Sequence, residues 1–332
     1  MKYLFIIINL FFSTTFAQTK VGTTAATFLG IGTGARAMGM GGAVTACLFD
    51  ASNNYWNPGT ISRINGNQFH ITGAEWLVDT RWNLISGILR PDDIRAIGFY
   101  ITHLDYGKEQ VTTLDQQMGT DDFWKAIDMA LGITYSQNLT DRFSLGTAAK
   151  YIYQSIYNEN AVSGAFDFGL LYQNIENSLR LGMTISNLGF DMIMSGKDLF
   201  KRIDLDPDSD GNNETIVASL KTDYWPLPIF FKVGIAKDLH VFNSSLLTFS
   251  IDGVIPSDDV EHLNLGSELK LNKYLYLRSG YRHIGKIDSE DSITLGVGAK
   301  LNLFTLPAEF NYAYQNYGVF GYLSHVGLTL NY

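Results

Sequence analysis

The sequence has few of the residues on which several common classes of protein depend. It contains a single cysteine, Cys47, and therefore cannot build an internal disulfide framework. Only 17% of its 332 residues are charged, the net charge is −9, and Lys and Arg form no cluster, which argues against a nucleic-acid partner. No Pro- or Ser-rich linker divides the chain, and no apolar run beyond residue 17 is long enough for a transmembrane helix.

Glycine and aromatic residues are abundant instead. The chain has 32 Gly and 13% aromatic residues, and its mean hydropathy is close to zero, at +0.02. A membrane β-barrel averages to such a value, because lipid-facing apolar residues and lumen-facing polar residues alternate along each strand. The composition therefore favours an all-β membrane protein.

Strict alternation supports this interpretation at several places. In residues 322–332 one parity is occupied by Tyr322, Val326, Leu328, Leu330 and Tyr332, with Ser324 as the exception, and Gly327, Thr329 and Asn331 lie between them. Residues 293–303 and 143–153 repeat the pattern, with Ile152 on the unexpected side. A soluble two-sheet sandwich also alternates, but it rarely has so many Gly and Lys on the opposite face. We expect an arginine in place of Val297 to meet lipid and to destabilise the barrel. An arginine in place of Gly298 should destabilise it less if the lumen has room.

The lengths of the connections alternate as well. Short turns, such as 91–93 and 271–273, alternate with long or polar connections at 107–125, 157–160, 189–226, 256–261, 286–291 and 316–321. If the first strand starts near Gly66, the count is about fourteen, an even number that returns the carboxyl terminus to the periplasm. The predicted fold is a transmembrane antiparallel β-barrel of about fourteen strands, in residues 66–332.

The amino terminus resembles a secretion signal. Met1-Lys2 precede an apolar stretch from Tyr3 to Phe12, and Thr15-Phe16-Ala17 offers small residues for a signal peptidase. We expect residues 1–17 to be a cleaved signal peptide, with an uncleaved first-helix anchor as the alternative.

Residues 18–65 lack strand periodicity and are rich in glycine. A phosphate-binding loop does not fit, because no strand precedes the glycines and no Gly-Lys-Ser/Thr follows. Glycines at this density let a non-strand backbone pack tightly inside a barrel. We predict that this segment is a hatch in the lumen, and that Arg36 is buried there with a partner, for which Asp50 is the candidate.

Residues 34–43 (Gly-Ala-Arg-Ala-Met-Gly-Met-Gly-Gly-Ala), Asp50-Ala51-Ser52 and Tyr55-Trp56-Asn57-Pro58 resemble the PorV/PorQ family of outer-membrane proteins, itself similar to the FadL long-chain fatty-acid transporters. Gly59 departs from the more usual Asn-Pro-Ala of that family. The resemblance implies a bacterial outer-membrane barrel of fourteen strands with an amino-terminal hatch. The hatch residues singled out are Gly34, Arg36, Gly39, Gly41, Gly42, Asp50, Asn57 and Pro58.

The remaining residues include one pattern typical of a metal site and no local catalytic motif. Asp206, Asp208 and Asp210, with Gly211 and Glu214, have the oxygen spacing of a calcium loop, although Val217 stands at the twelfth position; a solvated acidic turn is the alternative. The six histidines show no metal-ligand spacing, and no local catalytic motif occurs. Aromatic residues near strand ends, such as Trp82 and Tyr281, are typical of interfacial anchors.

The function expected from the resemblance is non-enzymatic. The barrel would lie in outer-membrane lipid and bind exported cargo, translocon or attachment proteins in type IX secretion or a related surface-assembly complex. The alternative is a FadL-like transporter of hydrophobic small molecules, and a lipid-modifying enzyme is a third class. Apart from calcium at residues 206–214, no cofactor is expected.

Overall fold

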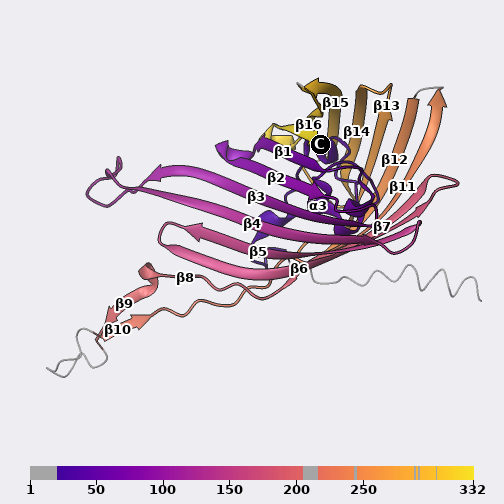
Figure 1. Cartoon of the computed structure of the whole chain (residues 1–332). Helices are drawn as coiled ribbons and strands as arrows, with labels where there is room; N and C mark the ends of the chain where they lie inside the picture. Colours follow the sequence, from indigo (N-terminus) through magenta and orange to yellow (C-terminus); the bar gives the residue numbers. More distant parts are fainter. Residues whose placement is uncertain (1–20, 205–215, 243–244, 288, 291, 304) are drawn as a thin grey trace, which may run out of the picture.

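The computed structural model describes residues 21–204, 216–242, 245–287, 289–290, 292–303 and 305–332, which form a closed antiparallel β-barrel around a folded segment (Figure 1). Within these ranges fourteen strands make the wall, as the sequence predicts. The first strand pairs with the second on one side and with the last on the other, so that it closes the ring.

The wall strands are β1 (Gln68–Glu75), β2 (Arg81–Leu89), β3 (Arg95–Gln110), β4 (Phe123–Asn138), β5 (Phe143–Ile156), β6 (Glu159–Asn174), β7 (Leu179–Gly189), β11 (Phe230–Phe242), β12 (Ser245–Pro256), β13 (His262–Lys270), β14 (Leu275–Ile284), β15 (Ile293–Leu303), β16 (Leu306–Asn316) and β17 (Tyr322–Asn331). The short strands β8 (Ser195–Gly196), β9 (Phe200–Ile203) and β10 (Ile216–Ser219) lie between β7 and β11.

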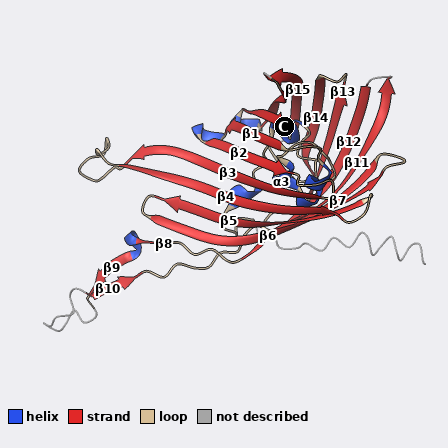
Figure 2. Cartoon of the chain, in the orientation of Figure 1, coloured by secondary structure: helices blue, strands red, loops and turns tan. Residues whose placement is uncertain are grey.

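The helical elements are short and lie in the hatch or in the connections (Figure 2). They are α2 (Ala35–Gly39), α3 (Asn53–Trp56) and the 3-10 helices η1 (Thr27–Gly30), η2 (Pro58–Arg63), η3 (Leu77–Asp79), η4 (Lys197–Leu199) and η5 (Gly318–Phe320). In the described part of the chain, no helix has the length and apolarity needed to cross a bilayer.

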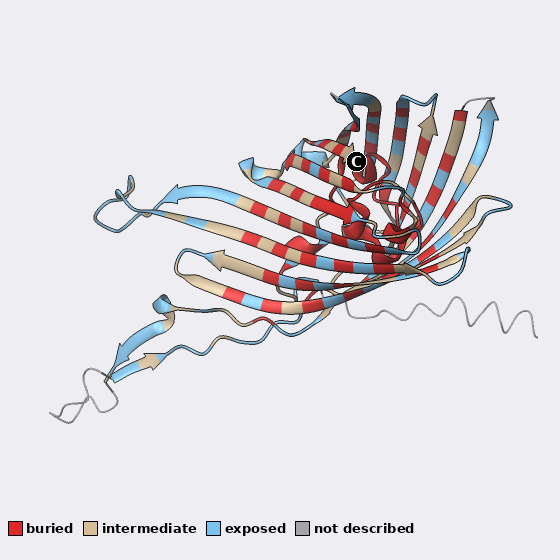
Figure 3. Cartoon of the chain, in the orientation of Figure 1, coloured by how far each residue is buried: buried red, intermediate tan, exposed pale blue. Residues whose placement is uncertain are grey.

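Buried and exposed residues alternate along the wall strands (Figure 3). In β15, Val297 faces outward and is 50% exposed, whereas Gly298 faces the lumen. In β17, Tyr322 and Val326 face outward, and His325 and Thr329 are buried inside. The assignment of faces from sequence parity is confirmed for both strands.

The two ends of the barrel differ in length. Strands β3, β4 and β6 have 16 residues each and β5 has 14, and in Figure 1 they project together on the side of β8–β10. The opposite end carries the tight turns that are typical of the periplasmic side. The connection after β5 lies where the sequence predicts it, at residues 157–160, but it is two residues shorter: only Tyr157 and Asn158 separate β5 from β6, with Tyr157 at φ +54°.

The described part of the hatch crosses the lumen from one end to the other. At the outer end, the Thr24 hydroxyl donates to Asp258 in the β12–β13 connection at 2.5 Å. At the periplasmic end, Arg63 donates to the carbonyls of Thr140 and Asp141, and the Tyr332 amide donates to the Asn67 carbonyl. The segment then turns into β1.

Apolar hatch side chains explain the lumenal Ile152. This residue is fully buried and belongs to one cluster with Phe28 and Leu29 of the hatch and with Trp82. A lumen filled by protein accepts apolar side chains that a water-filled lumen would not. For the same reason Trp82 is not an interfacial anchor: it is 1% exposed, and its indole donates to the Gly32 carbonyl at 3.1 Å.

Two predicted features lie outside the described residues. They are the signal peptide, residues 1–17, and the calcium ligands Asp206, Asp208, Asp210 and Glu214.

Candidate functional site: the hatch and the outer vestibule

All eight hatch residues singled out from the sequence, Gly34, Arg36, Gly39, Gly41, Gly42, Asp50, Asn57 and Pro58, are buried inside the barrel. Gly41 shows why the hatch needs glycine. Its φ is +66°, and a Cβ there would lie 2.8 Å from the Leu265 carbonyl oxygen in the wall. Only glycine combines that backbone conformation with so close an approach.

Wall glycines match the hatch glycines on the opposite side of the lumen. A Cβ on Gly59 would lie 2.7 Å from the carbonyl carbon of Gly169 in β6. A Cβ on Gly146 in β5 would collide with the carbonyl oxygen of Pro58. The hatch backbone therefore rests directly on the wall backbone, without side chains between them.

Asn57 and Asn54 bind the hatch to the wall through their amide groups. The Asn57 side chain donates to the carbonyls of Thr45, at 2.6 Å, and Leu170, at 3.2 Å, and it accepts from the Gly59 amide at 2.9 Å. Asn54 donates to the Gly87 carbonyl in β2 at 3.0 Å. Buried polar groups need such partners, and here the partners hold the hatch in one register.

Arg36 is paired, but not with Asp50 as the sequence suggested. Its guanidinium donates to both carboxylate oxygens of Glu268, at 2.6 and 2.8 Å, and lies 3.4 Å from Glu309. Arg278 donates to the same Glu268 at 2.6 Å, so the pair is one part of a buried network.

Asp50 interacts with Ser52 and His70 and not with Arg36. Its carboxylate accepts from the Ser52 amide at 2.9 Å and lies 3.8 Å from Nδ1 of His70, which is fully buried in β1. The distance in sequence between Arg36 and its true partners, more than 230 residues, explains why local spacing did not reveal them.

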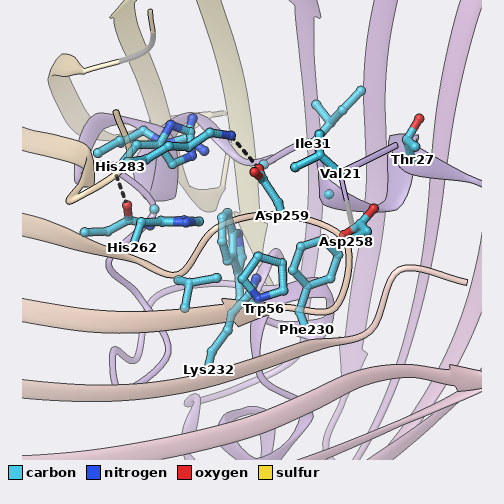
Figure 4. A pocket seen from close by; sticks show the side chains of 18 of the residues that line it. Val21, Thr27, Ile31, Trp56, Phe230, Lys232, Asp258, Asp259, His262 and His283 are labelled. Carbon is cyan, nitrogen blue, oxygen red and sulfur yellow. Dashed lines mark hydrogen bonds and ion pairs between the residues drawn. The ribbon is translucent and has the colours of Figure 1, made fainter. Parts of the chain in front are cut away.

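A cavity of about 350 Å³ lies above the hatch at the outer end of the barrel (Figure 4). We call it the outer vestibule. Its lining combines aromatic and apolar side chains with charges, and it includes Ile31, Tyr55, Trp56, Trp76, Phe230, Lys232, Val254, Pro256, Asp258, Asp259, His262, Arg282, His283, Lys286 and Tyr317. Sequence reasoning missed this site because its residues come from the hatch, four strands and several loops, with no common spacing.

The acidic groups of the vestibule already have partners. Asp259 pairs with Lys286 at 2.5 Å, and Asp258 accepts from Thr24 at 2.5 Å. His262 and His283 stack edge to face, with ring centroids 4.5 Å apart. Among the residues that the structure describes, no group of three or more His, Cys, Asp or Glu is placed to hold a metal ion.

A second cavity, of about 240 Å³, lies under the hatch toward the periplasm. Arg36 lies at its inner end, where the guanidinium is 4.4 Å from the ring centroid of Phe49, and Lys270 and Lys300 also line it. This cavity shares no lining residue with the outer vestibule. The hatch separates the two.

Comparison with solved structures supports the fold. The toluene transporter TodX of Pseudomonas putida is 15% identical, with a TM-score of 0.56 over 90% of this chain and 97% of that one. A FadL homologue of Pseudomonas aeruginosa is 13% identical, with a TM-score of 0.51 over 90% of this chain and 96% of that one. At such identities the likeness shows a common barrel architecture. No curated protein sequence matches.

The family model described as "Type IX secretion system protein PorV" matches residues 14–198, which is more than half of the chain. The match includes the whole hatch and the strands from β1 to β7. The chain therefore belongs to the PorV family of type IX secretion outer-membrane proteins.

Proposed function

We propose that this outer-membrane barrel is a non-enzymatic binding component of type IX secretion, which recognises exported cargo, translocon or attachment proteins through its outer loops. The observation that carries the proposal is the contact of hatch backbone with wall backbone on both sides of the lumen, at Gly41 and Leu265 and at Gly59 and Gly169. A solute would have to displace this backbone to pass. Recognition at the outer surface needs no such movement.

The outer surface offers apolar side chains for binding. The connection between β3 and β4 carries Leu114, which is 93% exposed, and Met118, which is 95% exposed. Val217 in β10 and Phe200 in β9 are 62% and 56% exposed on the neighbouring projection. Exposed apolar groups beyond the membrane band are typical of protein-binding surfaces.

The proposal is tested by making the β3–β4 tip polar with the double substitution Leu114→Ser and Met118→Ser. Cargo that copurifies with the barrel, and cargo found outside the cell, should both decrease while the amount of barrel stays constant. Leu139→Ser is the matched control, because Leu139 is 51% exposed but lies in the opposite, periplasmic turn. Unchanged cargo recovery in the double variant, and in a variant with residues 112–121 replaced by a Gly-Ser linker, would refute binding through this tip.

Transport of hydrophobic small molecules is the second candidate, and the outer vestibule is the observation that favours it. The cavity opens outward, and solutes could enter it before any movement of the hatch. Uptake of toluene by cells with and without the barrel distinguishes the two functions. Slower uptake without the barrel, together with normal cargo secretion, would replace the binding proposal by transport.

A further inference from the structure

Strands β9 and β10 form a two-stranded ribbon that projects from the outer end of the barrel (Figure 1). Within the described residues, neither strand pairs with any other. All four residues of β9 are exposed, as are three of the four in β10, so neither face of the ribbon is covered (Figure 3). An isolated pair of strands is marginally stable in water, and three or more strands are needed for independent stability.

The register of the ribbon shows which backbone groups remain free. The Leu220 amide donates to the Leu199 carbonyl at 2.9 Å, so these two residues form a hydrogen-bonded pair. Along antiparallel strands such pairs alternate with pairs whose N–H and C=O groups point away from the partner strand. Counted from Leu199, Val217 and Arg202 form a pair of the second kind. The backbone groups of Val217 and Ser219 therefore lie along the free edge of β10, and those of Arg202 along the free edge of β9.

The two free edges differ in charge. Strand β9 carries Lys201 and Arg202, and charged side chains on an edge strand discourage pairing with another chain. Strand β10 reads Ile-Val-Ala-Ser, without a charged residue, and its Val217 is 62% exposed. An exposed edge without charges is a template for a further strand. The edge of β10 is therefore the receptive one.

An apolar groove of about 420 Å³ lies at the base of the ribbon. The apolar part of its lining is Ile193, Met194, Leu199, Phe200 and Leu220. Ser219, at the end of β10, also lines the groove, so a strand paired with β10 would bring an alternate side chain beside it. Recognition by strand addition uses this combination, in which backbone hydrogen bonds give affinity and pockets for alternate side chains give specificity.

We propose that β10 accepts an extended segment of a partner polypeptide as a third strand, with an apolar side chain of that segment in the groove. The inference rests on the protein binding proposed above and deepens it. It adds backbone pairing at β10 to the apolar contacts of the β3–β4 tip.

The test uses a capped, fluorescent hexapeptide, Thr-Val-Thr-Phe-Thr-Val, and an analogue that is N-methylated at the two central residues, which lie on opposite edges of the peptide. Binding to the purified barrel, in a detergent with an uncharged headgroup, is measured by fluorescence anisotropy. The analogue should bind at least about tenfold more weakly, because methylation removes a donor and prevents close approach at the pairing edge. This comparison needs no variant of the barrel.

The variant Val217→Pro should weaken binding of the unmethylated peptide to a similar extent, because proline removes a free-edge donor that the ribbon itself does not use. Arg202→Pro is the matched control, because Arg202 has the equivalent position on the other edge. This control should bind the peptide like the parent.

No binding of the hexapeptide, equal affinity of the two peptides, or an unchanged affinity in Val217→Pro would overturn the proposal, even if cargo is recovered normally. The double variant of the β3–β4 tip should bind the hexapeptide like the parent. A failure of cargo binding at the tip is thereby distinguished from a failure of strand pairing at β10.

Discussion

At the residue scale, position along a strand decides what a side chain meets. Val297 faces outward in the middle of its strand, opposite Leu277 and Tyr312 of the neighbouring strands. Leu303 has the same parity but lies at the turn into β16. An arginine costs about 2–4 kcal/mol at the bilayer midplane and about 0–1 kcal/mol near an interface. We therefore expect Val297→Arg to be destabilising and Leu303→Arg to be nearly neutral.

Equilibrium unfolding by urea in lipid vesicles measures both variants, and equal costs would contradict the assigned depth. Gly298, the lumenal comparison suggested by the sequence, does not serve this purpose. A Cβ there would lie 2.6 Å from Asn311 Oδ1 and 2.8 Å from both terminal nitrogens of Arg278, so an arginine would have to displace these hydrogen-bonded side chains. The expectation that Gly298→Arg would be milder is therefore not supported by the packing.

Arg36 provides the second prediction at this scale. Arg36→Met removes the bidentate partner of Glu268 and leaves buried carboxylates with fewer cations. Loss of one partner from a buried pair costs about 3–5 kcal/mol. The double variant Arg36→Met, Glu268→Gln should cost less than the sum of the two single variants, because the charges are removed together. Strictly additive free energies of unfolding would show that the two residues are not coupled.

At the element scale, the hatch depends on its fit to the wall, and Cys47 reports that fit. Cys47 is fully buried, so a reagent reaches its thiol only when the hatch moves. Gly146→Ala pushes a methyl group into the Pro58 carbonyl and should loosen the hatch. We expect faster labelling of Cys47 by a maleimide in this variant.

The matched control is Gly253→Ala in β12. A Cβ there faces outward, and its nearest contact is an ordinary 3.7 Å from Leu263. If Gly146→Ala and Gly253→Ala label at the same rate as the parent, the hatch tolerates displacement at Pro58 and the close packing is not what holds it.

The connection between β7 and β11 carries the prediction of a calcium site. Strands β9 and β10, which precede and follow the acidic segment in the sequence, pair Ile203 with Ile216. We predict that calcium binds Asp206, Asp208, Asp210 and Glu214 and slows proteolysis there, because the ion offsets the repulsion between the carboxylates. Limited proteolysis with calcium and with chelator is the measurement, and Asp208→Ala should remove the difference. The same cleavage rate in both conditions would leave a solvated acidic turn.

At the scale of the whole molecule, a filled lumen predicts electrical behaviour unlike that of a porin. The outer vestibule and the periplasmic cavity share no lining residue, and hatch backbone lies between them. In planar bilayers the purified barrel should show no stable conductance of porin size, and Gly146→Ala should conduct more often. A large, steady conductance of the parent protein would mean that the hatch leaves an open path.

The wall could be predicted from the sequence because its information is local. Parity and the lengths of most turns are properties of a few adjacent residues, and they led to the fourteen strands and to the faces of β15 and β17. The partners of Arg36 and the vestibule could not be predicted in this way. They bring together residues such as Arg36 and Glu309, which meet only when the ring is closed around the hatch.

Closure of that ring imposes an order on assembly. Strand β1 pairs with β17, so the seam cannot close before the last residues of the chain arrive. On the inside, η2 packs against β3–β6, whereas α2 packs against β14–β17, near the seam. A chain is not threaded through a finished ring. In addition, the Asn54 and Asn57 side chains, which donate hydrogen bonds to wall carbonyls, are fully buried in the lumen. We therefore expect the amino-terminal segment to be in place before the seam closes, with the later strands folding around it.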